Sequence, residues 1–152
     1  MANTATATAD GRRVALLECD LAEPALAAAL GLVEQPGLHE YLRGDVEAPQ
    51  ILQPLVLAGP AAGGAVEPLT CIVAGAPEPH PVGLIDSARC DEAIERLRSA
   101  YDLLVIDGPG LGEDPDSLRA LAEHATSRLL CGGNGDAGKR LPFPVDGVIL
   151  VG

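Results

Sequence analysis

The chain has 152 residues, the usual size of one domain, and its 22 acidic against 10 basic residues give a net charge of −12. Such a charge repels nucleic-acid backbones and acidic lipid surfaces. Hydrophobic residues make up 47% of the chain but aromatic ones only 2%, so a core must consist of Leu, Val, Ile and Ala. No apolar run approaches the about 20 residues of a membrane helix, and the first residues lack the apolar part of a secretory signal. We therefore expect a cytoplasmic globular protein with no nucleic-acid partner and no direct membrane insertion.

The first half of the chain alternates strand and helix patterns. An apolar run predicts a strand over 13–19, and a helix over 23–30 follows, with Pro24 in its first turn and Gly31 after its end. A second short helix over 38–42 lies between a Pro-Gly pair and Gly44. Residues 48–68 contain four prolines and the run GPAAGGA, which predict a loop with one helical turn near Ile51.

The second half continues the alternation. We expect, in chain order, a strand over 69–74, a proline-rich turn over 75–81, an amphipathic helix over 87–100, a strand over 103–107, a helix over 116–124 and strands over 128–131 and 148–151. Residues 132–147 would be a loop insertion. This order predicts an α/β fold in one domain, 1–152, with a three-layer, open, mostly parallel sheet and helices on both faces.

Two of the apolar runs end in carboxylates. The first is VALLECDLAEP, Val14 to Pro24, which carries Glu18 and Asp20, and the second is LLVIDGPG, Leu103 to Gly110, which carries Asp107. Parallel strands deliver their carboxyl ends to one sheet edge, where open α/β sheets bind ligands. An acid that merely caps a strand end is the alternative for each. The cysteines and histidines are dispersed without metal-ligand spacing, so we read the cysteines as apolar filling.

Five ordered blocks resemble the bacterial tyrosine kinase domain of exopolysaccharide and capsule biosynthesis, within the MinD/ParA-like P-loop ATPases. The blocks are ECD with its following proline, PGLHEYLRG, AGAPEPHPVGLIDS, VIDGPG and VDGVILV. The resemblance implies a Walker A′ acid pair at Glu18 and Asp20, and a Walker B acid at Asp107. It implies Asp20 and Asp107 as magnesium ligands, Glu18 as candidate base, and nucleotide contacts from Asp20, Asp107, Gly108 and Pro109.

The departures from that pattern bear on activity. The family's first Walker A′ Asp is Glu18 here, the basic pair that follows is Ala22-Glu23, and no C-terminal tyrosine cluster is present. Residues 1–12 resemble the end of the helix after a phosphate loop, which implies an N-terminally truncated fold without the Walker A lysine. The segment GNGDAGK at 133–139 satisfies G-x-x-x-x-G-K, but Arg140 replaces the Ser or Thr hydroxyl and two prolines follow, so we read it as a surface loop.

We therefore expect a degenerate or truncated nucleotide-binding domain of the polysaccharide-export kinase type, with weak or no ATP turnover. Mg and ATP or ADP are its cofactors if any nucleotide binds, and otherwise it has none. It would regulate or dock on the exopolysaccharide machinery at the inner face of the membrane. Its partner would be a membrane-bound co-polymerase or a complete paralogue, or else it forms homo-oligomers.

Two alternatives stay open. One is an active Mg-ATP-dependent kinase or ATPase, if a phosphate loop lies upstream of Met1, and the other is a ParA/MinD-like positioning ATPase. A sheet without its phosphate-loop strand would expose an edge. We expect either that residues 128–131 or 148–151 close part of that gap or that the protein associates with itself or a partner.

Overall fold

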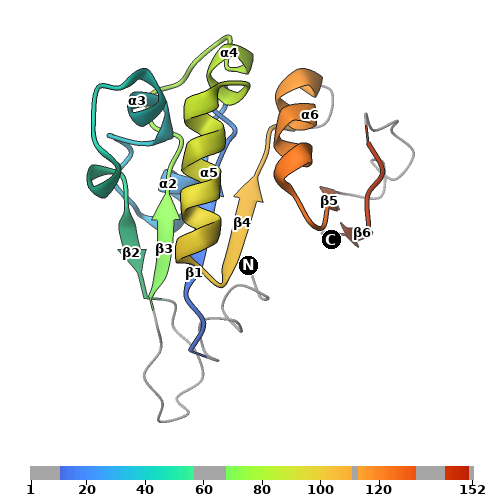
Figure 1. Cartoon of the computed structure of the whole chain (residues 1–152), viewed down its shortest axis with the longest axis horizontal. Helices are drawn as coiled ribbons and strands as arrows, with labels where there is room; N and C mark the ends of the chain where they lie inside the picture. The colour runs from blue at the N-terminus through green and yellow to red at the C-terminus, as the bar shows by residue number, and fades with distance from the viewer. Residues whose placement is uncertain (1–10, 57–67, 111–112, 133–142, 151–152) are drawn as a thin grey trace.

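The computed structural model describes residues 11–56, 68–110, 113–132 and 143–150. Its strands form two sheets (Figure 1). Four strands follow the order β2 (Gln53–Leu55), β3 (Leu69–Ile72), β1 (Val14–Glu18) and β4 (Leu103–Asp107). All pairings in this sheet are parallel except that of β2 with β3. The second sheet holds the parallel pair β5 (Leu129–Gly132) and β6 (Gly147–Leu150).

Strand β1 is the centre of the core, and its five side chains are all buried. Leu17 and Cys19 pack on one face with the apolar side of helix α5 (Ala88–Ala100). Val14 and Leu16 pack on the opposite face with helix α2 (Leu26–Leu30). Both faces of a buried parallel strand must be apolar, which explains the continuous hydrophobic run from Val14 to Leu17. The helices on the two faces give the three layers that the sequence predicts.

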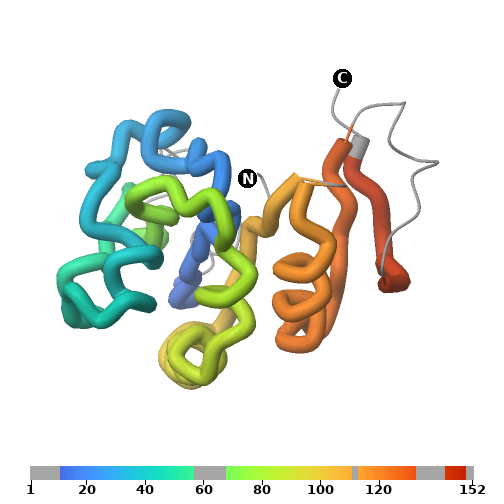
Figure 2. Tube along the Cα trace, turned by 90° about the horizontal axis from the view of Figure 1, so that it is seen from above, coloured from blue at the N-terminus to red at the C-terminus, as the bar shows by residue number. Residues whose placement is uncertain are grey.

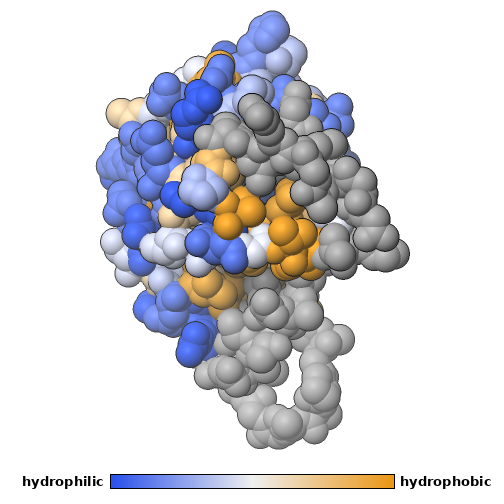
Figure 3. Space-filling view, turned by 90° about the vertical axis from the view of Figure 1, so that its right-hand side faces the viewer, coloured by the Kyte–Doolittle hydropathy of each residue, from blue (hydrophilic) through white to orange (hydrophobic). Residues whose placement is uncertain are grey.

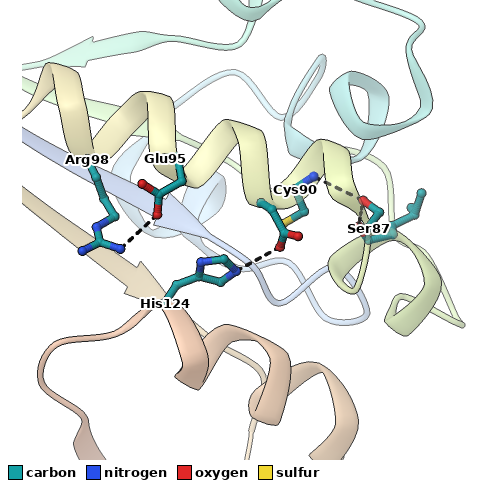
Figure 4. Close-up of polar contacts among 7 residues, drawn as sticks. Ser87, Cys90, Glu95, Arg98 and His124 are labelled. Atoms are coloured by element: carbon teal, nitrogen blue, oxygen red, sulfur yellow. Dashed lines mark hydrogen bonds and ion pairs between the residues drawn. The ribbon is translucent and has the colours of Figure 1, made fainter.

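The longer helices begin at capping residues that the sequence signals. In α5, the Ser87 hydroxyl accepts a hydrogen bond from Cys90 N at 3.2 Å (Figure 4). Helix α6 (Pro115–His124) begins after Asp114, whose carboxylate accepts a bond from Ser117 N at 3.0 Å. His124 at the end of α6 contacts the Asp91 carboxylate of α5 at 3.0 Å, which ties the two helices together (Figure 4).

Three short elements complete the described chain. Helix α3 (Leu38–Arg43) matches its prediction, and a 3-10 helix, η1 (Ala48–Gln50), supplies the turn expected near Ile51. The expectation of a loop over 48–68 misses β2, an edge strand that tolerates Pro54 because its outer side needs no donor. The proline-rich turn leads into an unpredicted helix, α4 (Val82–Ile85). Among the described helices, none combines the length and the apolar character that crossing a bilayer requires.

Two further expectations need correction, and two others concern segments outside the described residues. The helix predicted over 23–30 begins only at Leu26. The amide of Glu23 before it donates to Asp20, and that of Ala25 donates to Glu18. Within the described residues, β5 and β6 pair with each other and neither joins β4, so they do not close the edge as expected. Most of the predicted helix remnant at 1–12, and the G-x-x-x-x-G-K segment at 133–139, lie outside the described residues.

Candidate functional site

The two acid-ended strands lie side by side. Strands β1 and β4 pair in parallel with Glu18 in register with Asp107, so both acids reach the same sheet edge. The backbone continues this pairing beyond the strand, since Cys19 N donates to Asp107 O at 2.7 Å. Asp20 follows two residues after Glu18. The structure thus brings together the three acids that the sequence singles out.

Glu18 is buried, with only 2% of its surface exposed, and both of its carboxylate oxygens are occupied. Oε1 accepts hydrogen bonds from Ala25 N and Leu26 N, both at 2.7 Å, and Oε2 accepts one from Ala74 N at 2.8 Å. These amides belong to the start of α2 and to the segment after β3. Glu18 therefore joins three segments of chain, and its three hydrogen bonds leave one acceptor position, on Oε2, for a proton or a metal ion.

Asp20 is partly exposed and shapes the turn that leads to α2. Its Oδ1 accepts a hydrogen bond from Glu23 N at 3.0 Å, a side-chain to backbone bond typical of aspartate turns. Such a bond leaves the second oxygen of the carboxylate as a further acceptor. Asp20 can accordingly face a cation while it holds the turn.

Asp107 is exposed at the end of β4, but desolvation of its carboxyl group raises its pKa above the usual 3.8. The charges of Glu18 and Asp20 raise the pKa further. Among the described residues, the charged groups that shift this pKa are thus both negative. Two loop residues follow: Gly108, where an added Cβ would contact Leu118 of α6, and the buried Pro109. In the described chain, none of the ion pairs involves Glu18, Asp20 or Asp107.

Two cavities open near this edge, and acids line both. The larger, about 250 Å³, lies between the turn after β1, the proline-rich turn and the loop after β4, where Pro109, His80, Glu113 and Asp114 line it. The smaller, about 180 Å³, is lined by Glu18 and Glu34 among apolar residues. Among the described residues, neither lining includes Lys or Arg. Phosphates prefer cationic or amide donors, so these cavities disfavour a free triphosphate.

The structure adds an acid that the sequence analysis does not single out. Glu40 of α3 accepts hydrogen bonds from Gly37 N at 2.8 Å and Ala76 N at 3.0 Å. Its Oε1 also lies 3.8 Å from His39, whose other ring nitrogen is 3.5 Å from Glu78. The bond from Gly37 N is only half of a capping box, because glycine has no side chain; a Glu three residues after the Gly that precedes α3 is the sequence signal that could have found it. Glu40 fastens the segment after β3 to α3.

The donor set fits magnesium better than it fits phosphate. Magnesium is usually held by one or two carboxylates together with waters and substrate phosphates, and Asp20 and Asp107 supply two such groups. Among the described residues, however, no group of three or more His, Cys, Asp or Glu side chains is arranged to hold a metal ion. A magnesium ion held by Asp20 and Asp107 would therefore need oxygens from water or from a bound phosphate to complete its coordination.

The chain has relatives among tyrosine-protein kinases, although no protein-family model matches it. It is 31% identical over 99 residues to a putative tyrosine-protein kinase, EpsB, of Ralstonia nicotianae, and these cover 65% of this chain and 12% of the relative. The tyrosine-protein kinase wzc of Salmonella typhimurium is 29% identical over 119 residues, which cover 78% of this chain and 15% of the wzc chain. CpsD of Streptococcus pneumoniae is 27% identical over 104 residues, 68% and 41% of the two chains. The chain thus spans less than half of each of these relatives.

Solved structures show the same relation. The VpsO kinase domain superposes with a TM-score of 0.72 at 27% identity, covering 96% of this chain and 73% of its own. The BceF tyrosine kinase domain gives a TM-score of 0.72 at 25% identity, covering 97% and 59%. MinD of Pyrococcus horikoshii, solved with Mg-ADP, gives 0.61 at 23% identity, covering 89% and 52%, and this likeness concerns the fold alone. The resemblance and the P-loop α/β fold expected from the sequence are both confirmed.

Proposed function

Since this chain is a homologue of the kinase domains of bacterial tyrosine-protein kinases, with the P-loop ATPase fold of MinD, we propose that it is a degenerate nucleotide-binding domain with weak or no ATP turnover. Its task is to regulate or dock on exopolysaccharide machinery at the inner face of the membrane. One observation carries the proposal: the described site consists of clustered carboxylates, and the described residues that line the cavities beside it include no Lys or Arg.

The roles of the three acids follow from their bonds. Glu18 acts as a structural acceptor for three amides, whereas Asp20 and Asp107 keep oxygens that a magnesium ion could share. Gly108 and Pro109, which follow Asp107 in the chain, would contribute contacts to the nucleotide. Asp20 and Asp107 would hold magnesium, which would supply positive charge to offset theirs and attract phosphate. Among the described residues that line the cavities, no Lys or Arg is present to hold the phosphates, which explains why weak or no turnover is expected.

Hydrolysis of radiolabelled ATP by the purified protein tests the catalytic part of the proposal. We expect phosphate to be released no faster than in the same magnesium-containing buffer without the protein. Turnover that disappears in both Asp20→Asn and Asp107→Asn but persists in Asp45→Asn, an exposed acid beyond α3, would contradict it. That result would favour the second candidate, an active Mg-ATP-dependent kinase or ATPase, which the homology itself supports.

Sedimentation with membrane vesicles tests the docking part. The vesicles would contain the membrane-bound polysaccharide co-polymerase of the same cell, and matched vesicles would lack it. We expect the protein to pellet only with the first kind. Equal pelleting, or none with either, would refute docking on the co-polymerase. Added complete tyrosine kinase should compete for the same site if a paralogue is the partner instead.

A further inference from the structure

His39 of α3 is a buried histidine whose ring makes no hydrogen bond within the described chain. Its side chain is 13% exposed, and neither Nδ1 nor Nε2 has a hydrogen-bond partner. Buried polar atoms in folded proteins nearly always have one, so each exception needs a physical reason. Both nitrogens face carboxylates instead: Nδ1 lies 3.8 Å from Glu40 and Nε2 lies 3.5 Å from Glu78.

The two carboxylates decide which form of the ring fits between them. A neutral imidazole has one N–H donor and one lone pair, an imidazolium has a donor on each nitrogen, and an ionised carboxylate only accepts. In either neutral tautomer, one ring nitrogen would therefore turn its lone pair toward the lone pairs of a carboxylate. The charged ring can donate to Glu40 and Glu78 at once. Both distances are longer than a hydrogen bond, so the ring is placed to bind a proton and is not yet closed on its acceptors.

The other polar groups of the surrounding elements are directed elsewhere. Helix α4, which packs against α3, consists of the uncharged residues VGLI. His80, the second histidine near this place, is exposed, and its backbone N–H donates to Glu78 Oε1 at 3.0 Å. Arg43 at the end of α3 lies 3.5 Å from Asp45. In the described chain, the carboxylates within 4 Å of the His39 ring are thus those of one residue on its own helix and one across from it.

The two carboxylates belong to segments that are anchored differently. The backbone of α3 is fixed to the chain after β3, because His39 N donates to Ala74 O at 2.8 Å. Glu78 lies in the proline-rich turn over 75–81, and its amide donates to Leu21 O at 2.8 Å in the segment after β1. Figure 2 shows this turn beside α3. A charged His39 would therefore draw the turn, and the segment bonded to it, toward α3.

The same turn forms a wall of both cavities at the sheet edge. Pro79, His80 and Pro81 line the larger cavity, and Gly75 and Pro77 line the smaller one. A charge-assisted hydrogen bond between nitrogen and oxygen is about 2.7–2.9 Å long, shorter than either contact of the His39 ring. Closing these contacts would thus move a wall that the two cavities share.

We propose that His39 is a proton-operated latch. When its ring takes up a proton from solvent, it donates to Glu40 and Glu78 together and fastens the turn over 75–81 to α3. When the proton leaves, the turn is released. Access to both cavities would then depend on pH in the range where histidine changes its charge. The inference stands whether or not nucleotide binds, because it concerns a wall of the cavities and not the three acids at the strand ends.

Amide hydrogen exchange by NMR tests the latch on the full chain. Protection factors, which remove the intrinsic effect of pH on exchange, are compared at about pH 5.5 and about pH 7.5, toward the two ends of the histidine range. The amides of Ala76 and Glu78 report on the turn, since they donate to Glu40 and to Leu21. We expect both to be about tenfold or more better protected at the lower pH, the effect of one bond to a charged group. Imidazole nitrogen spectra should show both His39 nitrogens gaining protons over the same pH interval.

Three variants separate the latch from other titrating groups. His39→Gln removes the charge and should abolish the pH response of both amides. His80→Gln is the matched control, because His80 is an exposed histidine of the same turn, and it should keep the response. Glu78→Gln leaves His39 in place and removes the acceptor charge on the turn, so it should also abolish the response at residue 78. This second variant decides the outcome if His39→Gln does not fold.

Association of the protein is the competing source of a pH effect, because the net charge falls as the pH approaches the pI of about 4.4. Figure 3 shows apolar side chains on the side that carries β5 and β6, where Leu129 is 56% and Val148 is 49% exposed. A rise in protection of equal size at the Leu129 and Val148 amides would indicate association and overturn the latch. Equal protection of the turn at both pH values, or a response that persists in His39→Gln, would overturn it as well.

Discussion

Replacement of Glu18 by Gln tests whether this buried acid holds the fold. The carboxylate accepts three backbone amides. The amide oxygen of Gln can still serve Ala25 and Leu26, but its NH₂ group would face the N–H of Ala74, a donor against a donor. A hydrogen bond to a charged group contributes about 1.5–3 kcal/mol and a neutral one about 0.5–1.5.

The magnitude follows from these bonds. Two bonds would each weaken by about 1 kcal/mol, and the third would be lost at about 2 kcal/mol. Relief from burying a charge offsets about 1 kcal/mol of this sum. We expect Glu18→Gln to lower the free energy of unfolding by about 3 kcal/mol, which for a domain of this size lowers Tm by about 6–12 °C.

Urea unfolding followed by far-ultraviolet circular dichroism measures the effect, since the chain has no Trp for fluorescence. Glu23→Gln is the matched control, because Glu23 is exposed in the same turn, and it should stay within about 0.5 kcal/mol of wild type. If Glu18→Gln were as stable as this control, the assignment of Glu18 as a structural acceptor would be wrong.

Three other substitutions give distinct outcomes. The raised pKa of Asp107 means that its ionisation destabilises the fold as the pH rises above the usual pKa of 3.8. In thermal melts Asp107→Asn should therefore be more stable than wild type near pH 7 but not near pH 3. The control Asp45→Asn should show no such gain. Desolvation raises the pKa of Glu40, but hydrogen bonds from Gly37 and Ala76 outweigh it and hold that pKa below its usual 4.5. Glu40→Gln should therefore lower the free energy of unfolding by about 1–2 kcal/mol in urea titrations near pH 7. The difference should disappear as the pH falls through the lowered pKa. In the same titrations Gly37→Ala, whose Cβ would meet backbone atoms of Gly75 and Val73, should cost more than about 2 kcal/mol, whereas Gly83→Ala, which meets open space, should cost less than about 1.

Local signals predicted most of the elements correctly. Gly31 ends α2 with a positive φ of 67°, Ser87 begins α5, and Asp114 begins α6, all as their residue types indicate. Apolar runs likewise located β1 and β4, and their parallel pairing brought Glu18 and Asp107 to one edge as expected. These features depend on short stretches of sequence, which carry their own periodicity and caps.

The features that were missed depend on distant partners. Strand β2 contains Pro54 and gains its structure only by pairing with β3, which no local pattern encodes. The bonds of Glu18 come from Ala25, Leu26 and Ala74, and only the folded chain assembles these amides around it. The sequence also does not show that β5 and β6 form a sheet apart from β4. Their apolar runs predict strands but do not say which neighbours those strands pair with.

Titration calorimetry with Mg-ATP addresses the proposed function most directly. The account predicts no saturable heat on adding millimolar Mg-ATP to the protein, because the described lining residues include no Lys or Arg to hold the phosphates and magnesium on two carboxylates does not replace those donors. Titration of Mg-ATP into Asp107→Asn serves as the reference for dilution heat. Saturable binding to the wild-type chain that Asp107→Asn abolishes would contradict the account.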